Sequence, residues 1–315
     1  MDRRSSELVD FKAPRTPLDD HPLTCTQLLS RASKDFKFRF INSICRQLLI
    51  TMSEPASKRQ KTYPSYTLLY HPGIPGRGEY VRLALEAAGA PYTDAGNESS
   101  AGKKDVYASI DAKSTRVEGN PPPFAPPMLK VAGEGKDGGT LLISQTPNIL
   151  LYLGTTLGLA GEDEVDKYYV NGLALTALDL SNEAHDTHHP IAGMLFYEEQ
   201  KDESLRKSQD FREHRVPKYF SYFERVLKGN EEGGGRYLVG SKLTYADTTL
   251  WHVLDGLHFA FPKECDARQK DYPLLIGTFY PGMKEEEGLK KYLESGRRIP
   301  FSNCLFRHYP ELDRE

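Results

Sequence analysis

The chain has 315 residues, of which 38% are hydrophobic and 27% are charged, and its formal net charge is −3 at pH 7. This length predicts about two domains, and the composition is typical of a globular protein. The chain is not strongly basic, as nucleic-acid-binding proteins typically are. No apolar run reaches the roughly 18 residues that a membrane span needs. We therefore expect a cytoplasmic protein with no nucleic-acid and no membrane partner.

The four cysteines, Cys25, Cys45, Cys265 and Cys304, are widely separated along the chain. No Cys-x-x-Cys pair occurs, which excludes both a thioredoxin-type redox motif and a cysteine-rich zinc site. Scattered cysteines of this kind are typical of a reducing compartment, so we expect free thiols.

The first 65 residues show no sustained hydrophobic period and mix charges of both signs with Ser, Thr and Pro. Asp10 and Asp19 argue against a mitochondrial transit peptide, because such peptides are poor in acidic residues. The basic run at 58–61 could be a nuclear signal, but we favour a solvated basic linker. We expect residues 1–65 to be a disordered extension. Met52 is a plausible natural first residue of the protein.

The stretch from Tyr66 to Gly89 has the pattern of a strand, a glycine-rich turn and a helix. Residues 66–70 form an apolar run that is too short for a helix and predicts a strand buried on both faces. A helix follows from about Arg77 and ends at Gly89, which suits a C-terminal cap. Because ligands of such units bind at the carboxyl end of the strand, we expect the phenol of Tyr70 to project into a crevice.

The next elements complete a small α/β unit. Residues 91–94 can form a second short strand, and 105–111 an irregular helix. The proline cluster at 120–127 cannot be the interior of a strand. Residues 128–131 and 140–144 then predict a hairpin around a glycine-rich turn. This order of elements predicts a thioredoxin-like domain.

A second motif, Gln145-Thr146-Pro147, begins the next helix. Thr146 can act as the N-cap, and proline is favoured at the first helical position. The N-terminus of this helix would face the same crevice as Tyr70. It would offer unpaired backbone N–H groups and a positive dipole end to an anion.

The second half of the chain is helical. Residues 165–186 predict one long helix and 202–227 another, in which Pro217 predicts a kink or a break. Thr244 and Asp247 have the spacing of a capping box at the start of a third helix. We found no internal repeat.

Tyr70 followed by Gly76-Arg77-Gly78-Glu79, with Gln145-Thr146 downstream, resembles the motifs of the cytosolic glutathione transferases of the tyrosine type, in a fungal-like form. The resemblance covers most of the chain after the first 65 residues. It implies a thioredoxin-like N-terminal domain at 66–156, which binds glutathione, and an all-helical C-terminal domain at 162–315.

The resemblance also implies that Tyr70 is the catalytic residue. A neutral phenol can donate a hydrogen bond to the glutathione thiol, which favours the thiolate. The reference pKa of such a thiol is about 8.5, and lowering it by about two units would make most of the thiol reactive at pH 7. Glutathione would be a co-substrate, with no separate cofactor. The implied glutathione-binding residues are Tyr70, Arg77, Pro126, Pro127, Gln145 and Thr146.

One position departs from the family pattern. The family holds a cis-proline before the third strand, and the residue before it pairs its N–H and C=O with the cysteine unit of glutathione. The best match makes Pro127 the cis residue, but Pro126 before it has no N–H. Either the bond between Ala125 and Pro126 is the cis one, or one glutathione contact is missing.

Four cations, Lys103, Lys104, Lys113 and Arg116, lie where the family often supplies a partner for the glycine carboxylate of glutathione. A single sequence does not align this loop. Most of these side chains are expected to be solvated charges.

Three histidines, His185, His188 and His189, cluster near the end of the first long helix. His185 and His189 could share a helix face and bind one cation. No glutamate base and no distant third ligand accompany them, and Pro190 ends the helix. We therefore favour histidines that line the substrate cleft, and we expect no metal.

We expect a glutathione transferase that conjugates the thiolate to a hydrophobic electrophile, in detoxification or secondary metabolism. A different reading is a catalytically silent binding or assembly module, which the missing N–H at Pro126 supports. A thiol reductase would need a cysteine near the strand end, where Tyr70 stands. The resemblance implies a homodimer. The helix at 165–186 carries more apolar residues than one packing face requires, so the surplus could face a partner or lie buried in its own domain.

Overall fold

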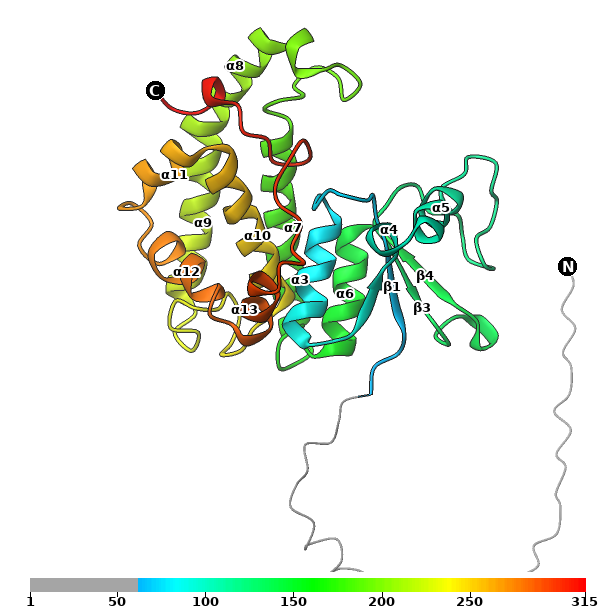
Figure 1. Cartoon of the computed structure of the whole chain (residues 1–315). Helices are drawn as coiled ribbons and strands as arrows, with labels where there is room; N and C mark the ends of the chain where they lie inside the picture. Colours follow the sequence, from blue (N-terminus) through cyan, green and yellow to red (C-terminus); the bar gives the residue numbers. More distant parts are fainter. Residues whose placement is uncertain (1–61) are drawn as a thin grey trace, which may run out of the picture. The chain divides into compact units, whose positions relative to one another are not determined.

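The computed structural model describes residues 62–315, and the chain Tyr63–Glu315 forms one compact unit (Figure 1). Expectations for residues 1–61 lie outside the described residues. The end of the expected extension already belongs to the fold, because the Tyr63 hydroxyl donates a hydrogen bond to the Ala88 carbonyl at 3.0 Å.

Four short strands form one mixed sheet in the order β2-β1-β3-β4. β1 runs parallel to β2 and antiparallel to β3, and β4 closes the sheet antiparallel to β3. The first strand and the hairpin form where the apolar run and the glycine-rich turn predicted them. The strands are β1 (Tyr66–Leu69), β2 (Tyr92–Asp94), β3 (Met128–Val131) and β4 (Leu141–Ser144).

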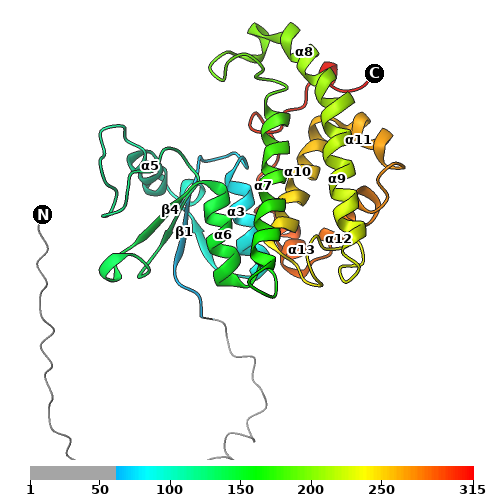
Figure 2. The same ribbon diagram turned by 180° about the vertical axis from the view of Figure 1, so that it is seen from behind.

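Helices cover both faces of the sheet, and they are α3 (Gly78–Ala88), α4 (Ala95–Glu98), α5 (Ser100–Ser109) and α6 (Thr146–Leu157). α3 and α6 lie side by side, between the sheet and the helical half, whereas α5 lies on the other side (Figures 1 and 2). α5 begins five residues earlier than the predicted helix at 105–111. The reason is a side-chain cap, in which the Ser99 hydroxyl accepts a hydrogen bond from the Gly102 N–H at 2.9 Å.

The helical half has seven α-helices among the described residues: α7 (Asp166–His185), α8 (Lys201–Asp210), α9 (Val216–Gly229), α10 (Tyr245–Ala260), α11 (Pro262–Arg268), α12 (Tyr280–Met283) and α13 (Glu287–Glu294). The kink or break predicted at Pro217 takes the form of a local distortion. The chain stays helical from Lys201 to Gly229, and a π-helical turn, Phe211–Arg215, joins α8 to α9 just before Pro217. None of the described helices combines the length and the apolar character that crossing a membrane requires.

The capping box that begins α10 is confirmed. The buried Asp247 carboxylate accepts hydrogen bonds from the Thr244 N–H and hydroxyl, both at 2.7 Å. It also accepts one from the Leu238 N–H at 2.7 Å, which ties the preceding loop to the helix. α10 is buried over most of its length and packs against both α7 and α3, so the two halves share one core.

The C-terminal segment, residues 295–315, returns along α3 and α10 toward the end of α7 (Figures 1 and 2). Leu305 and Phe306 are buried in this segment. A Cβ on Gly256 of α10 would lie 2.3 Å from the Phe306 ring, so only glycine lets the segment cross the helix at this point. This crossing brings the residues just before Leu305 to the end of β1.

Candidate functional site

A cleft of ≈ 430 Å³ lies where the sheet half meets α7. Its lining includes five of the six expected glutathione-binding residues, namely Arg77, Pro126, Pro127, Gln145 and Thr146. They come from three separate loops, after β1, before β3 and after β4. The fold therefore brings together motifs that are far apart in the sequence.

The N-terminus of α6 forms one wall of this cleft. Gln145, with φ 72° and ψ 121°, is the N-cap, and Thr146 is the first helical residue. The expectation that Thr146 would be the N-cap is therefore wrong, because the chain turns into the helix one residue earlier. Thr146 is 4% exposed, and its hydroxyl has no hydrogen-bond partner. The free hydroxyl and the unpaired N–H groups of the first turn suit an anionic group of a ligand.

The opposite wall carries the proline pair. The peptide bond between Pro126 and Pro127 is cis, and Pro127 is buried whereas Pro126 is half-buried at the cleft. The alternative with a cis bond between Ala125 and Pro126 is not found. Pro126 can offer a ligand its carbonyl but no N–H.

α7 supplies a third wall, which the sequence analysis did not assign to the site. Leu175, Leu178, Asp179 and Asn182 line the cleft, at the three- and four-residue spacing of one helix face. The apolar residues of this helix therefore face two ways. Four of them are buried in the core, namely Leu173, Ala174, Ala177 and Leu180. Two others line the cleft, namely Leu175 and Leu178. The spacing from 175 to 182 was the signal that could have found these residues.

Arg77 links the sheet half to α7. It is the N-cap of α3, and its guanidinium donates a hydrogen bond from Nη2 to Asn182 Oδ1 at 2.8 Å. The Asp179 carboxylate lies on the same stretch of the cleft and is exposed. The cleft thus offers one carboxylate and one guanidinium to a ligand that carries both charges.

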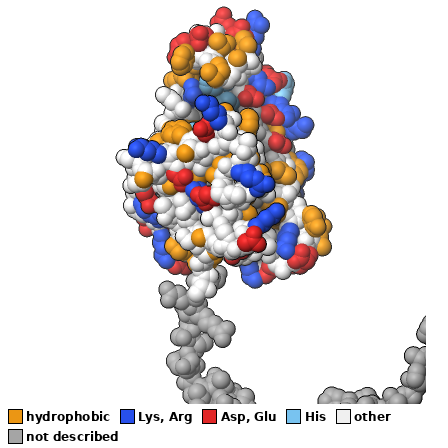
Figure 3. Space-filling view, turned by 90° about the vertical axis from the view of Figure 1, so that its right-hand side faces the viewer, with side chains coloured by type: hydrophobic (Ala, Val, Ile, Leu, Met, Phe, Trp, Pro, Cys, Tyr) orange, Lys and Arg blue, Asp and Glu red, His pale blue; other side chains and the backbone are white. Residues whose placement is uncertain are grey.

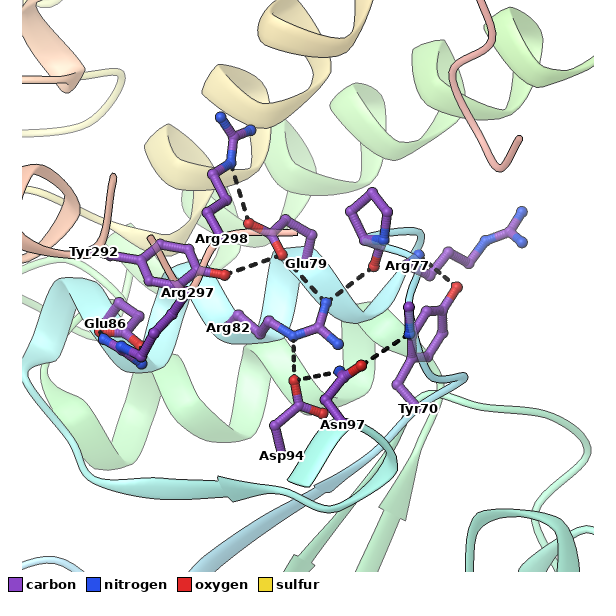
Figure 4. Close-up of polar contacts among 12 residues, drawn as sticks. Tyr70, Arg77, Glu79, Arg82, Glu86, Asp94, Asn97, Tyr292, Arg297 and Arg298 are labelled. Carbon is purple, nitrogen blue, oxygen red and sulfur yellow. Dashed lines mark hydrogen bonds and ion pairs between the residues drawn. The ribbon is translucent and has the colours of Figure 1, made fainter. Parts of the chain in front are cut away.

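Tyr70 follows the last residue of β1 and is 5% exposed. Its hydroxyl oxygen accepts a hydrogen bond from the Arg77 N–H at 2.8 Å (Figure 4). The ring packs against the first turn of α3, where a Cβ on Gly78 would come within 2.6 Å of it. Tyr70 is not part of the cleft lining; it is connected to the cleft through Arg77, whose backbone it binds.

Burial sets the ionisation of this phenol. It raises the pKa of Tyr70 to about 12, so the hydroxyl keeps its proton at neutral pH. The Arg77 N–H occupies a lone pair of the oxygen and leaves the O–H free to donate. Tyr70 is therefore a fixed, protonated donor.

A cysteine that sequence reasoning did not connect with the site lies beside this hydroxyl. A Cβ on Gly76 would lie 2.1 Å from the Tyr70 hydroxyl and 2.8 Å from the Cys304 sulfur. Burial raises the pKa of the Cys304 thiol, and the hydrogen bond with Tyr70 opposes that rise only partly. The neutral Cys304 thiol is thus hydrogen-bonded to the same phenol that would donate a hydrogen bond to the glutathione thiol.

A buried charge network lies behind Tyr70 (Figure 4). The Glu79 carboxylate is fully buried and accepts hydrogen bonds from Arg82 at 3.2 Å and from Tyr292 at 3.3 Å. Arg298 of the C-terminal segment also contacts Glu79 at 3.3 Å, and Arg82 pairs with Asp94 at 2.8 Å. The network joins α3 to β2, α13 and the C-terminal segment, so its role is structural.

The candidate cations for a glycine carboxylate are not at the site. Lys103, Lys104, Lys113 and Arg116 are exposed, and none of them lines the cleft. The three histidines at the end of α7 also lie outside its lining.

A family model described as "Glutathione S-transferase, C-terminal domain" matches residues 185–296. Among curated proteins, the chain is 26% identical over 211 residues to a glutathione S-transferase of Plasmodium falciparum, covering 66% of this chain and 86% of the relative. It is 27% identical over 239 residues to glutathione S-transferase P 1 of Xenopus laevis, covering 75% and 94% respectively.

Solved structures show the same arrangement. A Pi-class glutathione S-transferase of Onchocerca volvulus aligns with a TM-score of 0.54 at 25% identity, covering 76% of this chain and 97% of the other. A sigma-class enzyme of Fasciola hepatica aligns with a TM-score of 0.55 at 20% identity, covering 76% and 99%, and supports the fold alone.

Proposed function

We propose that the chain is a cytosolic glutathione S-transferase, like the proteins it resembles, and that it conjugates the thiolate of glutathione to a hydrophobic electrophile. Glutathione is the co-substrate, no separate cofactor takes part, and we place the reaction in the cytoplasm, in detoxification or secondary metabolism. We assign glutathione binding to the domain at 66–156 and the electrophile pocket to the helical domain at 162–315. The fungal-like subtype remains a prediction.

The γ-glutamyl end of glutathione carries a carboxylate and an ammonium group. The first turn of α6, with the unpartnered Thr146 hydroxyl, suits the carboxylate, and Asp179 suits the ammonium group. Gln145 and Arg77 flank this position, and the Pro126 carbonyl can accept the N–H of the cysteine unit. This placement directs the thiol toward the end of β1.

One observation carries the catalytic assignment: the Arg77 N–H holds the Tyr70 hydroxyl at 2.8 Å while the Arg77 side chain lines the cleft. A protonated phenol in this position donates to the glutathione sulfur and stabilises the thiolate. The thiolate then attacks the electrophilic carbon, forming the carbon–sulfur bond as the leaving group departs or as a double bond accepts the electron pair.

The direct test is conjugation of a generic aryl halide, followed as thioether formation with and without glutathione. The proposal expects turnover that saturates with glutathione and exceeds the uncatalysed rate. Retention on immobilised glutathione without any turnover would instead identify the second candidate, a silent binding module. Two observations favour that candidate, namely the absent N–H at Pro126 and the 5% exposure of Tyr70.

A thiol reductase is less well supported, although a cysteine does lie at the strand end. The Cys304 thiol has a raised pKa because it is buried, whereas a reductase needs a thiolate. Its neutral thiol shares the Tyr70 hydroxyl, so glutathione must displace it.

We therefore predict that Cys304→Ala binds glutathione more tightly. In this variant glutathione no longer has to break the hydrogen bond between the Cys304 thiol and the Tyr70 hydroxyl. Such a bond is worth about 1 kcal/mol, so the apparent KM for glutathione should fall about fivefold. The measurement is a glutathione titration at saturating electrophile. Cys265→Ala is the control, because Cys265 is the other free cysteine among the described residues and lies in α11. An unchanged or raised KM in Cys304→Ala would mean that the two thiols do not compete.

We also propose a homodimer, because large apolar side chains are exposed in both halves. Phe124 is 91% exposed beside the proline pair, and Tyr168 of α7 is 79% exposed. A hollow of ≈ 550 Å³ opens between α7 and α9, lined by Tyr169, Leu173 and Tyr222 among others. An aromatic ring from the sheet half of a second copy would fit this hollow.

The dimer gives a measurable expectation. Light scattering at micromolar concentration should give a mass near twice 35.5 kDa, and Phe124→Glu should bring it close to 35.5 kDa, because a carboxylate in an apolar hollow is costly. Met194→Glu is the control, since Met194 is 94% exposed in the loop after α7. A wild-type mass of one chain across this range would contradict the dimer.

A further inference from the structure

Three histidines at the C-terminal end of α7 come together in space. His185, His188 and His189 each offer one ligand atom, and these atoms all lie within 4.8 Å of one another. The ring centroids are 5.0, 5.1 and 4.9 Å apart. The third histidine, which the i, i+4 pattern left out, comes into place because the chain leaves the helix at Asp186 and turns back on itself.

One nitrogen of each ring contacts a neighbouring polar group. The His185 Nδ1 lies 3.2 Å from the Asp186 carboxylate. The His188 Nε2 lies 3.2 Å from the Leu305 carbonyl, and the His189 Nδ1 lies 3.2 Å from the Gln200 side-chain nitrogen. A ring that donates from one nitrogen keeps a lone pair on the other, which is how metal-binding histidines are oriented.

The free nitrogen of His188 is the most informative. His188 is 1% exposed, and its Nδ1 has no hydrogen-bond partner. A buried polar atom without a partner costs free energy, which a ligand can recover.

We propose that His185, His188 and His189 form a binding site for one Zn²⁺ ion, with a fourth position open to water. Imidazole nitrogens bind zinc at about 2.0–2.1 Å, which places them roughly 3.3 Å apart in a tetrahedral site. The three nitrogens must therefore close by up to about 1.5 Å, through rotation of His185 and His189, which are only half-buried. This reverses the expectation of no metal that we drew from the sequence.

The site would fasten the C-terminal segment to α7. His188 already contacts the Leu305 carbonyl, and Leu305 follows Cys304, the residue beside the Tyr70 hydroxyl. A bound cation would fix His188 and thereby the segment that covers the phenol. Arg307 lies close enough to oppose the cation electrostatically, and the Asp186 carboxylate balances it. Histidine side chains reach the surface below the uppermost lobe in Figure 3. His185 and His189 are half-buried, so an ion can reach the site from solvent.

The test uses the full chain prepared without a polyhistidine tag and titrated with Co²⁺, a spectroscopic substitute for zinc, and with Zn²⁺ by calorimetry. We expect one equivalent of Co²⁺ with a tetrahedral visible spectrum and no thiolate-to-cobalt charge-transfer band. His185→Ala and His189→Ala should each weaken binding at least about tenfold, and these half-buried positions should keep the fold. His188→Ala, at the buried position, should do the same.

His214→Ala is the matched control, because His214 is exposed in the turn between α8 and α9. It should bind the metal like the parent chain. Absence of stoichiometric binding, a thiolate charge-transfer band, or equal affinity in His185→Ala, His189→Ala and His214→Ala would each overturn the site.

Discussion

Tyr70→Phe is expected to lower turnover by about 10- to 100-fold near pH 6.5 while leaving glutathione affinity almost unchanged. The hydroxyl would account for a lowering of the thiol pKa by about two units, or ~2.7 kcal/mol, whereas affinity rests on the contacts of the cleft. Phenylalanine fits the same position because it loses only the oxygen, which binds the Arg77 N–H. Steady-state kinetics and a glutathione binding titration separate the two effects.

The pH profile makes this prediction sharper. In the parent enzyme kcat/KM should rise with pH and reach a plateau above the lowered thiol pKa, since the Tyr70 pKa of about 12 keeps the phenol protonated throughout. In Tyr70→Phe the rise should move up toward the reference thiol pKa of about 8.5. Tyr107→Phe is the control, because Tyr107 is 52% exposed on α5. Identical profiles in all three proteins would remove Tyr70 from the mechanism.

Arg82→Met is expected to be the most destabilising change considered, at about 3–5 kcal/mol. It removes the cation that pairs with the buried Glu79 and with Asp94, so Glu79 loses one of its two cations and Asp94 loses its ion-pair partner (Figure 4). Arg298 still contacts Glu79 at 3.3 Å, but its other ion pair is with Asp255 and not with Asp94. The free energy of unfolding from a urea titration measures the loss.

Arg297→Met provides the matched control for this change. Arg297 makes a two-point ion pair with Glu86, at 2.6 and 2.9 Å, but its side chain is 56% exposed. Water screens such a pair, and its loss should cost less than about 1 kcal/mol. If the two variants proved equally stable, the buried network would contribute no more than a surface pair.

Some features follow from short stretches of sequence, because local chemistry decides them. The apolar run before the glycine turn forms β1, a π-helical turn distorts the helix just before Pro217, and Thr244 with Asp247 builds a capping box. Each depends on residues within a few positions of one another, where backbone geometry and short-range hydrogen bonds dominate. The motif resemblance extended this reading to the fold and to five of the residues that line the cleft, but not to its α7 wall.

Local exceptions mark where neighbouring residues compete. The chain enters α6 at Gln145 rather than Thr146, since the backbone of Gln145 turns out of the strand with a positive φ. α5 begins at Ser100 because Ser99 supplies a side-chain cap that the apolar pattern did not reveal. Boundaries of this kind depend on small free-energy differences between alternative ends of a helix.

The sequence by itself determined the elements, the resemblance and the phenol at the end of β1. Only the tertiary structure decided what surrounds that phenol. Cys304 reaches Tyr70, and Leu305 reaches His188, because the C-terminal segment crosses α10 at a glycine. Contacts between residues so far apart in the chain carry no local signal; they form because packing one buried core brings the last segment back over the first helix.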